Sequence, residues 1–246
     1  MRKPYLLLAG HTAALGYCGG VLKAAGLPLA GRPEEAVTHL VLPVPSFGPD
    51  GTIQGGGDIA ALLEKLPRDI TVVGGRLDHP ALAAYRKIDL LQEDAYTAAN
   101  ANITAHCAVK LAMNKLPVIF AGLPVLVIGW GRIGKCLAQL LRQMGAEVTV
   151  AARNPKDRAM LGALGYRCIG TENPDLLPYR VVFNTVPVML SPQSPGDALK
   201  IDLASQLGLG SLDVVWARGL PGKEAPESAG RLMARRIIHI LKEDSE

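Results

Sequence analysis

The residues best suited to chemistry lie in a glycine-rich turn near the middle of the 246-residue chain. The turn follows the pattern G-x-G-x-x-G, and its members are Gly129, Trp130, Gly131, Arg132, Ile133 and Gly134. In this pattern the first glycine permits a tight turn, the second lets a pyrophosphate approach the backbone, and the third lets a helix pack closely on a strand. The phosphates then lie at the positive end of that helix. The turn predicts dinucleotide binding.

A rival motif overlaps the same residues. Gly129, Gly134 and Lys135 also fit G-x-x-x-x-G-K, the phosphate loop of nucleotide hydrolases. The next residue is Cys136, where that loop needs a Ser or Thr hydroxyl to bind magnesium. The hydrolase motif also leaves Gly131 without a role, so we favour the dinucleotide site.

The residues that follow the next strand select between cofactors. An NAD site usually has an Asp or Glu about 20 residues beyond the first glycine. Here that place holds Ala151-Ala152-Arg153-Asn154, and Lys156 and Arg158 follow closely. Because this place holds cations and no carboxylate, it favours the 2′-phosphate of NADP. NAD is the alternative cofactor. The same residues also fit an ordinary solvated start of a basic helix.

The elements around the turn have the order that this site requires. Residues 125–128 predict a buried strand, apolar residues at helical spacing follow from Ile133 to Met144, and residues 147–151 predict a second strand. Two later apolar runs end in polar residues, at 184–187 and 202–205, where the nicotinamide would lie. We assign these further residues to the cofactor site: Ala152, Arg153, Asn154, Lys156, Asn184, Thr185, Val186, Pro187, Asp202, Ala204, Gly219 and Pro221.

Both ends of the chain add alternating strands and helices. We expect strands over 5–9, 38–42, 70–74, 181–184, 199–203 and 213–216, and helices over 13–25, 58–66, 80–86, 94–115, 155–164 and 226–242. The fold class is therefore α/β with two lobes. A Rossmann dinucleotide-binding domain spans 117–223, and a smaller flavodoxin-like parallel-sheet domain spans 1–116 and is closed by the C-terminal helix, 224–246. The proline-rich loop 43–51 follows a strand and is either a ligand loop or a plain surface loop.

Composition excludes several classes of function. The chain is 49% hydrophobic and 20% charged with a net charge of +4, which is ordinary for an α/β enzyme. Its basic residues are scattered, so we expect no nucleic-acid partner, and no apolar segment is long enough to cross a membrane. The cysteines and histidines show no metal-binding spacing. We expect a cytoplasmic protein with reduced thiols and no metal.

Residues 90–237 resemble the A subunit of the dipicolinate synthase family. The segments that carry the resemblance are VLVIGWGRIGKCLAQLLRQMGAEVTVAAR, NTVP, IDLAS and GLPGKEAPESAG, in this order. The resemblance implies a relative of the D-2-hydroxyacid dehydrogenases that uses a nicotinamide cofactor, oxidises dihydrodipicolinate to dipicolinate during sporulation, and works with a flavoprotein-like second subunit. The family's proline-rich loop resembles Leu42-Pro43-Val44-Pro45 here. We also expect a homo-oligomer.

Two segments depart from the family pattern. The family stretch N-A-I-P-T-A-E-G corresponds to Asn100-Ala101-Asn102-Ile103-Thr104-Ala105-His106-Cys107, in which His106 replaces the acidic residue. The family loop G-G-D-x-R corresponds to Ala9-Gly10-His11-Thr12-Ala13, which has neither charge. Both changes affect the expected substrate site more than the cofactor site.

A dicarboxylate substrate requires cations and hydroxyl groups. We assign His106, Ser205 and Arg218 to catalysis, and Ser46 and Lys223 to substrate binding. Two alternatives stay open. A D-2-hydroxyacid dehydrogenase would need an Arg and a His, but Gln206 follows Ser205 and Gly219-Leu220-Pro221 contains no His. A non-catalytic nucleotide-binding or scaffold protein would account for the altered loops.

Overall fold

The computed structural model describes residues 3–33, 35–194, 196–210 and 213–243. The chain divides into two compact units. Unit 1 comprises Met1–Asn100 and Pro221–Glu246, and unit 2 comprises Ala101–Leu220. The division falls within helix α3 (Asp94–Met113), whereas we expected a domain boundary after this helix, at residue 116. One continuous helix therefore contributes residues to both units.

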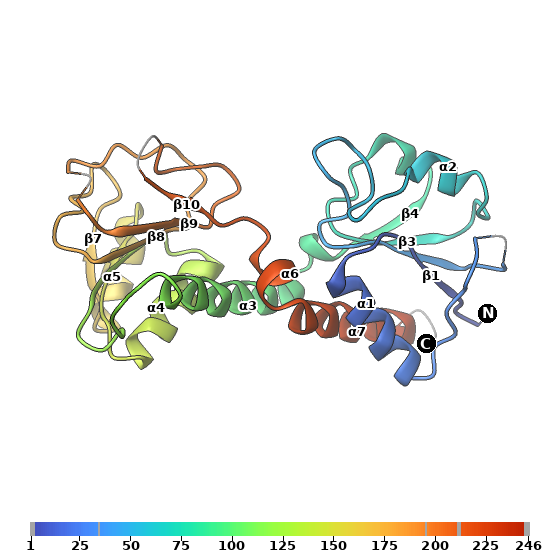
Figure 1. Cartoon of the computed structure of the whole chain (residues 1–246), viewed down its shortest axis with the longest axis horizontal. Coiled ribbons are helices and arrows are strands. Elements are labelled where there is room, and N and C mark those ends of the chain that lie inside the picture. The colour runs from blue at the N-terminus through green and yellow to red at the C-terminus, as the bar shows by residue number, and fades with distance from the viewer. Residues whose placement is uncertain (1–2, 34, 195, 211–212, 244–246) are drawn as a thin grey trace. The chain divides into compact units, whose positions relative to one another are not determined.

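Unit 1 contains a four-stranded parallel sheet in the order β1-β2-β3-β4 (Figure 1). The strands are β1 (Leu6–Leu8), β2 (His39–Val41), β3 (Thr71–Gly74) and β4 (Arg86–Asp89). Alternate residues face opposite sides, so Leu6, Val41 and Val73 join one core cluster. Leu7 and Val72 join the other. Helices therefore cover both faces, with α1 (Ala13–Ala24) and α7 (Pro226–Glu243) on one side and α2 (Ile59–Leu63) on the other.

An isolated β-bridge next to β1 takes the place of a fifth strand in unit 1. Leu29 forms an isolated parallel bridge with Leu6, on the side of β1 away from β2. Leu6 N–H donates to Pro28 O, and Ala30 N–H donates to Leu6 O. Counting this bridge as the second strand gives the order 2-1-3-4-5, which is the flavodoxin-like order. The two all-parallel sheets confirm the predicted fold class.

The predicted helix over 80–86 is wrong. The segment forms only a short 3₁₀ turn, η1 (Pro80–Leu82), and then enters strand β4. Arg86 and Lys87 of this strand are exposed. Charged residues are typical of edge strands, where they oppose pairing with other chains, so β4 lacks the apolar run that marks a buried strand. A second 3₁₀ turn, η2 (Leu90–Gln92), follows and leads into α3.

The C-terminal helix α7 (Pro226–Glu243) packs against α1 of unit 1. Its buried residues Met233, Ala234 and Ile237 extend the core cluster of Leu6 and Leu15. A side-chain pair ties α7 to the start of α3: Arg236 Nε donates to Glu93 Oε2 at 2.5 Å and Nη2 donates to Oε1 at 3.2 Å. This pairing with Glu93 raises the pKa of Arg236, so the guanidinium stays charged.

Unit 2 contains a six-stranded parallel sheet in the order β10-β9-β8-β5-β6-β7. The elements of this unit are β5 (Pro124–Ile128), α4 (Arg132–Gln143), β6 (Glu147–Ala151), α5 (Pro155–Ala163), β7 (Arg167–Ile169), β8 (Val181–Asn184), β9 (Leu199–Asp202) and β10 (Val215–Trp216). Numbered from β5, the order is 3-2-1-4-5-6, the Rossmann order. The strand order reverses direction between β5 and β8, so their carboxyl ends form the switch point where dinucleotides bind.

Three general expectations can be compared with the described residues. No helix among them is long and apolar enough to cross a membrane. No group of three or more His, Cys, Asp or Glu side chains within the described part could hold a metal ion. Cys18, Cys107, Cys136 and Cys168 are not joined in disulfides. Burial raises the pKa of the Cys18 thiol to about 12 and keeps it protonated.

Candidate functional site

The glycine turn is closely packed at its first and third glycines. Gly129 has a φ of +107°, and a Cβ atom there would collide with Thr185 Oγ1 and lie 2.9 Å from Val186 Cγ1. A Cβ on Gly134 would collide with Gly129 O. Thr185 in turn donates from Oγ1 to Ile128 O at 2.8 Å. The turn itself and the loop after β8 therefore require the first and third glycines.

The second glycine faces open space. A Cβ atom built on Gly131 would meet no heavy atom within 4 Å among the described residues. Gly131 is also the N-cap of α4 and makes no side-chain hydrogen bond to the first turn of that helix. The amides of this turn and the positive end of the helix suit a phosphate. The space beside Gly131 therefore fits the pyrophosphate of a dinucleotide.

The other residues of the turn are partly ordered by aromatic contacts. Trp130 is half-buried and packs edge-on against Tyr166, with 5.8 Å between ring centroids. Lys135 Nζ lies 5.8 Å from the centroid of Trp130. Ile133 is half-buried and Arg132 is exposed. Trp130 is thus an intrinsic fluorescence reporter next to the phosphate position.

The end of β6 presents cations and no carboxylate at the position that distinguishes NAD from NADP. Ala152 is buried, while Arg153, Asn154 and Lys156 are exposed. Asn154 Oδ1 accepts from Lys156 N–H at 2.9 Å and caps α5. Arg158, which we grouped with these cations, donates to the carbonyl oxygens of residues 152 and 153 at 2.8 Å each. Arg158 thereby holds the backbone of the loop, and Arg153 and Lys156 remain as the cations for a phosphate.

Two of the predicted cofactor residues are buried and hold the loops after β8 and β9. Asn184 Nδ2 donates to Asp202 Oδ2 at 2.9 Å, and both side chains are fully buried. Asp202 also accepts from the backbone N–H groups of Ala204, Gly208 and Leu209. A carboxylate with four donors is already satisfied. Direct contacts from this edge to a cofactor are therefore left to the more exposed residues Thr185, Val186 and Pro187.

The predicted catalytic residues of unit 2 lie at separate places. His106 of α3 is exposed and lines a pocket of about 350 Å³. The other lining residues are Val109, Lys110, Met113, Asn114, Leu140 and Met144. Leu140 is nine residues beyond Gly131, which is roughly 13 Å along a helix. The pocket therefore lies at the end of α4 opposite the glycine turn, and it gives no support to a catalytic role for His106.

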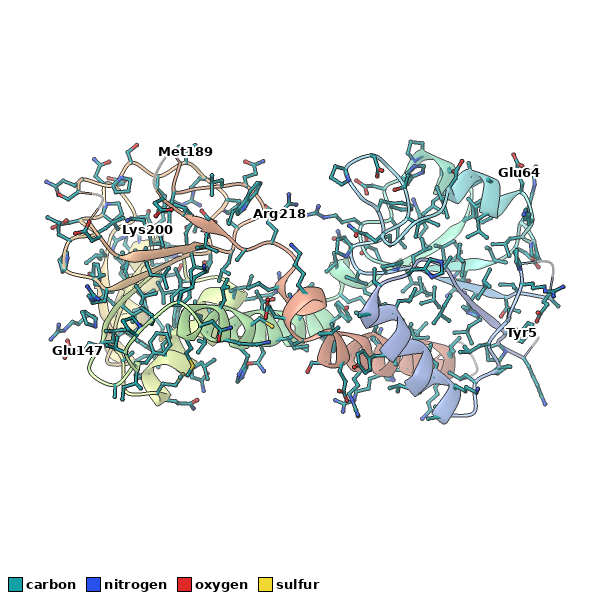
Figure 2. All side chains as sticks on the ribbon, viewed as in Figure 1. Tyr5, Glu64, Glu147, Met189, Lys200 and Arg218 are labelled. Atoms are coloured by element: carbon teal, nitrogen blue, oxygen red, sulfur yellow. The ribbon has the colours of Figure 1, made fainter. Side chains whose placement is uncertain are left out.

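Ser205 and Arg218 lie near the carboxyl ends of β9 and β10. Ser205 is exposed. Arg218 lies at the surface, where Figure 2 labels it, with its guanidinium carbon 5.2 Å from the ring centroid of Trp216. Trp216 Nε1 donates to Ala204 O at 3.1 Å and so joins the two strand ends. Gly219 follows with a φ of +67°, and Pro221 begins the return to unit 1.

In unit 1, the two predicted substrate residues differ in exposure. Ser46 is fully buried, and its Oγ donates to Pro43 O at 2.9 Å and accepts from Gly75 N–H at 3.0 Å. This serine orders the proline-rich loop, so a direct contact with substrate is not supported. Lys223 is exposed on the short helix α6 (Leu220–Glu224). Its role in substrate binding stays a prediction.

Arg76 is a residue that our sequence reasoning missed. It follows β3 directly after Gly74-Gly75, is exposed, and has a φ of +57°. Left-handed backbone is uncommon outside glycine and asparagine. The sequence pattern that could have identified Arg76 is a glycine pair followed by a cation at the end of a predicted strand. The identity of the residue as arginine does not indicate its left-handed backbone.

Comparison with known proteins confirms the resemblance inferred from the motifs. No protein-family model matches the chain. The A subunit of dipicolinate synthase from Bacillus subtilis (strain 168) is 26% identical over 238 residues, covering 86% of this chain and 80% of that protein. The crystal structure of the corresponding dipicolinate synthase subunit from Bacillus halodurans has a TM-score of 0.83 at 20% identity, covering 98% of both chains. A D-isomer specific 2-hydroxyacid dehydrogenase from Xanthobacter autotrophicus Py2 has a TM-score of 0.52 at 16% identity, covering 99% of this chain and 98% of that one.

Proposed function

We propose that this chain, similar to the A subunit of dipicolinate synthase in sequence and to the dehydrogenases in fold, is an NADP-dependent oxidoreductase that converts dihydrodipicolinate to dipicolinate. One observation carries the cofactor part of the proposal. Gly131 faces open space at the uncapped start of α4, while the glycines on either side are closely packed. This is the arrangement in which a backbone can receive a pyrophosphate. The substrate part rests on the resemblance.

The chain's own residues would do the following. The amides at the start of α4 bind the pyrophosphate, and Arg153 and Lys156 bind the 2′-phosphate. The Asn184–Asp202 pair holds the β8 and β9 loops so that Thr185 and Val186 support the nicotinamide. A bound oxidised nicotinamide would supply the hydride acceptor, and the substrate ring, having given up a hydride and a proton, would become aromatic. Aromatisation supplies the driving force, so the protein's main task is alignment.

An activity assay tests the proposal. Purified protein is expected to bind NADPH and to form dipicolinate, with NADP⁺ reduction at 340 nm, when freshly made dihydrodipicolinate is added. The assay is run with and without a flavoprotein-like partner, since the resemblance implies one, and the molar mass in solution is measured to test the expected homo-oligomer. NADPH binding without turnover in either assay would favour a non-catalytic nucleotide-binding protein. Turnover of a D-2-hydroxy acid instead would favour the dehydrogenase alternative.

Cofactor preference gives a second test. Arg153→Asp is expected to weaken NADPH binding about 10- to 100-fold, since one charge-assisted hydrogen bond to the 2′-phosphate is lost and a repulsive charge is added. Affinity for NADH should change little. Arg167→Asp is the matched control, because Arg167 is also exposed but begins strand β7 at the amino edge of the sheet. Titration calorimetry measures the affinities of the unmodified protein and both variants for NADPH and NADH. Equal affinity of the unmodified protein for NADH and NADPH would contradict the assignment of NADP.

A further inference from the structure

The segments that follow the carboxyl ends of the four strands in unit 1 include one lysine or arginine. Ligands of parallel α/β sheets bind at this edge. The segments that leave the four strands are 9–12, 42–58, 75–79 and 90–93, and Arg76 is the only lysine or arginine in them. Its side chain is exposed, and it has no ion pair among the residues that the structure describes. An anionic ligand at this edge would therefore find one cation.

The backbone of Arg76 is held in a conformation that arginine rarely adopts. Its φ of +57° lies in the left-handed region, where a side chain is strained and glycine is not. Hydrogen bonds on both sides fix this conformation. Leu77 N–H donates to Asp89 Oδ2 at 3.0 Å, Gly75 N–H donates to Ser46 Oγ at 3.0 Å, and Ser46 N–H donates to Gly75 O at 2.7 Å. Strain that the surroundings enforce is typical of ligand sites.

The loops around Arg76 are locked to one another. Phe47 of the proline-rich loop packs on His79, with 4.7 Å between ring centroids. The same loop closes on the β1 turn, where a Cβ on Gly10 would lie 2.9 Å from Pro43 Cγ. Gln54 N–H also donates to Ser46 O at 2.8 Å. Arg76 is thus displayed on a rigid edge, and a rigid support reduces the entropy that binding must overcome.

We propose that Arg76 anchors a carboxylate of the substrate and confers a preference for dicarboxylates. The planar guanidinium can donate two parallel hydrogen bonds to one carboxylate, which a lysine cannot do. Ser46 and Asp89 are positioning residues, because they hold the backbone on either side of Arg76. This inference rests on the proposed function for the identity of the substrate, but it assigns the anchor to a residue of unit 1 that the resemblance did not indicate.

The test compares ligand binding by four variants of the full chain. Titration calorimetry uses pyridine-2,6-dicarboxylate and pyridine-2-carboxylate. Arg76→Ala is expected to weaken binding of the dicarboxylate about 10- to 100-fold and that of the monocarboxylate less, and Arg76→Lys should recover only part of the loss. Arg68→Ala is the matched control, since Arg68 is exposed and lies before β3, at the opposite edge of the sheet. NADPH affinity should be the same in all of them.

Arg76→Gly separates binding from structure. Glycine adopts the left-handed conformation without strain, so this variant should unfold at a higher temperature and still bind the dicarboxylate weakly. Dicarboxylate affinity that is unchanged in Arg76→Ala would overturn the inference. If the unmodified protein binds NADPH and binds pyruvate or D-lactate through Arg76 but not the pyridine dicarboxylate, the anchor stands, and the dicarboxylate preference and the proposed substrate fall. If it binds none of these carboxylates, both fall.

Discussion

Replacing Gly131 with valine is expected to abolish dinucleotide binding and to leave the fold unchanged. The φ and ψ of Gly131 are −79° and −170°, an extended conformation that valine readily adopts. No described heavy atom lies within 4 Å of the added Cβ, so the protein without cofactor has room for the side chain. The valine side chain would leave no room for the pyrophosphate, because the path of the pyrophosphate to the amides of α4 passes through this space. Loss of two charge-assisted bonds would lower the affinity more than about 100-fold.

The matched variant is Gly134→Ala, three residues further along the same turn. Its Cβ would collide with Gly129 O, a backbone atom that cannot move without opening the turn. We therefore expect a lower unfolding temperature for Gly134→Ala and an unchanged one for Gly131→Val. NADPH binding is followed by the fluorescence of the two tryptophans, Trp130 and Trp216, and by calorimetry. Folding is followed by thermal unfolding monitored with circular dichroism. If Gly131→Val binds NADPH with the affinity of the unmodified protein, the turn joins a strand to a helix and serves no cofactor.

Gly230→Ala should destabilise unit 1 by about 2 to 3 kcal/mol, the upper part of the usual range for overpacked sites. At Gly230, helix α7 packs closely against α1. A Cβ there would lie 2.7 Å from Tyr17 Cβ and 2.8 Å from Cys18 N, and would collide with Ala14 O. These are main-chain and Cβ atoms, so no change of rotamer can relieve the contacts. The two helices would have to separate and open the core that Met233 and Ile237 share with Leu15 and Cys18.

The control is a glycine-to-alanine substitution at an exposed position of α1. Gly16 is exposed within α1, and a Cβ there would meet nothing within 4 Å among the described residues. Gly16→Ala should stabilise the helix by about 0.5 to 1 kcal/mol, because alanine loses less backbone entropy on folding. Urea unfolding followed by far-ultraviolet circular dichroism measures both variants. A Gly230→Ala protein as stable as the unmodified one would show that the helices can separate at little cost.

The sequence alone determined the βαβ unit and the position of its glycine turn. Strand 147–151 was predicted with its observed bounds, and the roles of the three glycines were predicted from their spacing. These features depend on neighbouring residues, since hydrophobic periodicity and glycine positions act over one turn or one strand. The order of strands and helices also implied two parallel sheets, because alternation along the chain leaves few other topologies.

Edge strands were harder to predict from sequence. Leu29, β4 and β7 were all missed, and each lies at or beside the edge of its sheet. β7 has only three residues, of which Arg167 is exposed, and β4 begins with two exposed charged residues. A strand at an edge buries fewer side chains, so selection for an apolar pattern is weak. The completed sheet stabilises these strands through hydrogen bonds to a neighbour that lies far away in the sequence.

Only the tertiary structure decided which predicted polar residues are available to ligands. Ser46 bonds to Gly75, 29 residues away, and Asn184 bonds to Asp202, 18 residues away. Both contacts bury side chains that the sequence placed at ligand-binding edges. The structure likewise gave Arg76 its left-handed backbone, which Asp89 and Ser46 enforce from other segments. Residue type indicates what a side chain can do, but partners brought together by folding decide whether its donors and acceptors are already used.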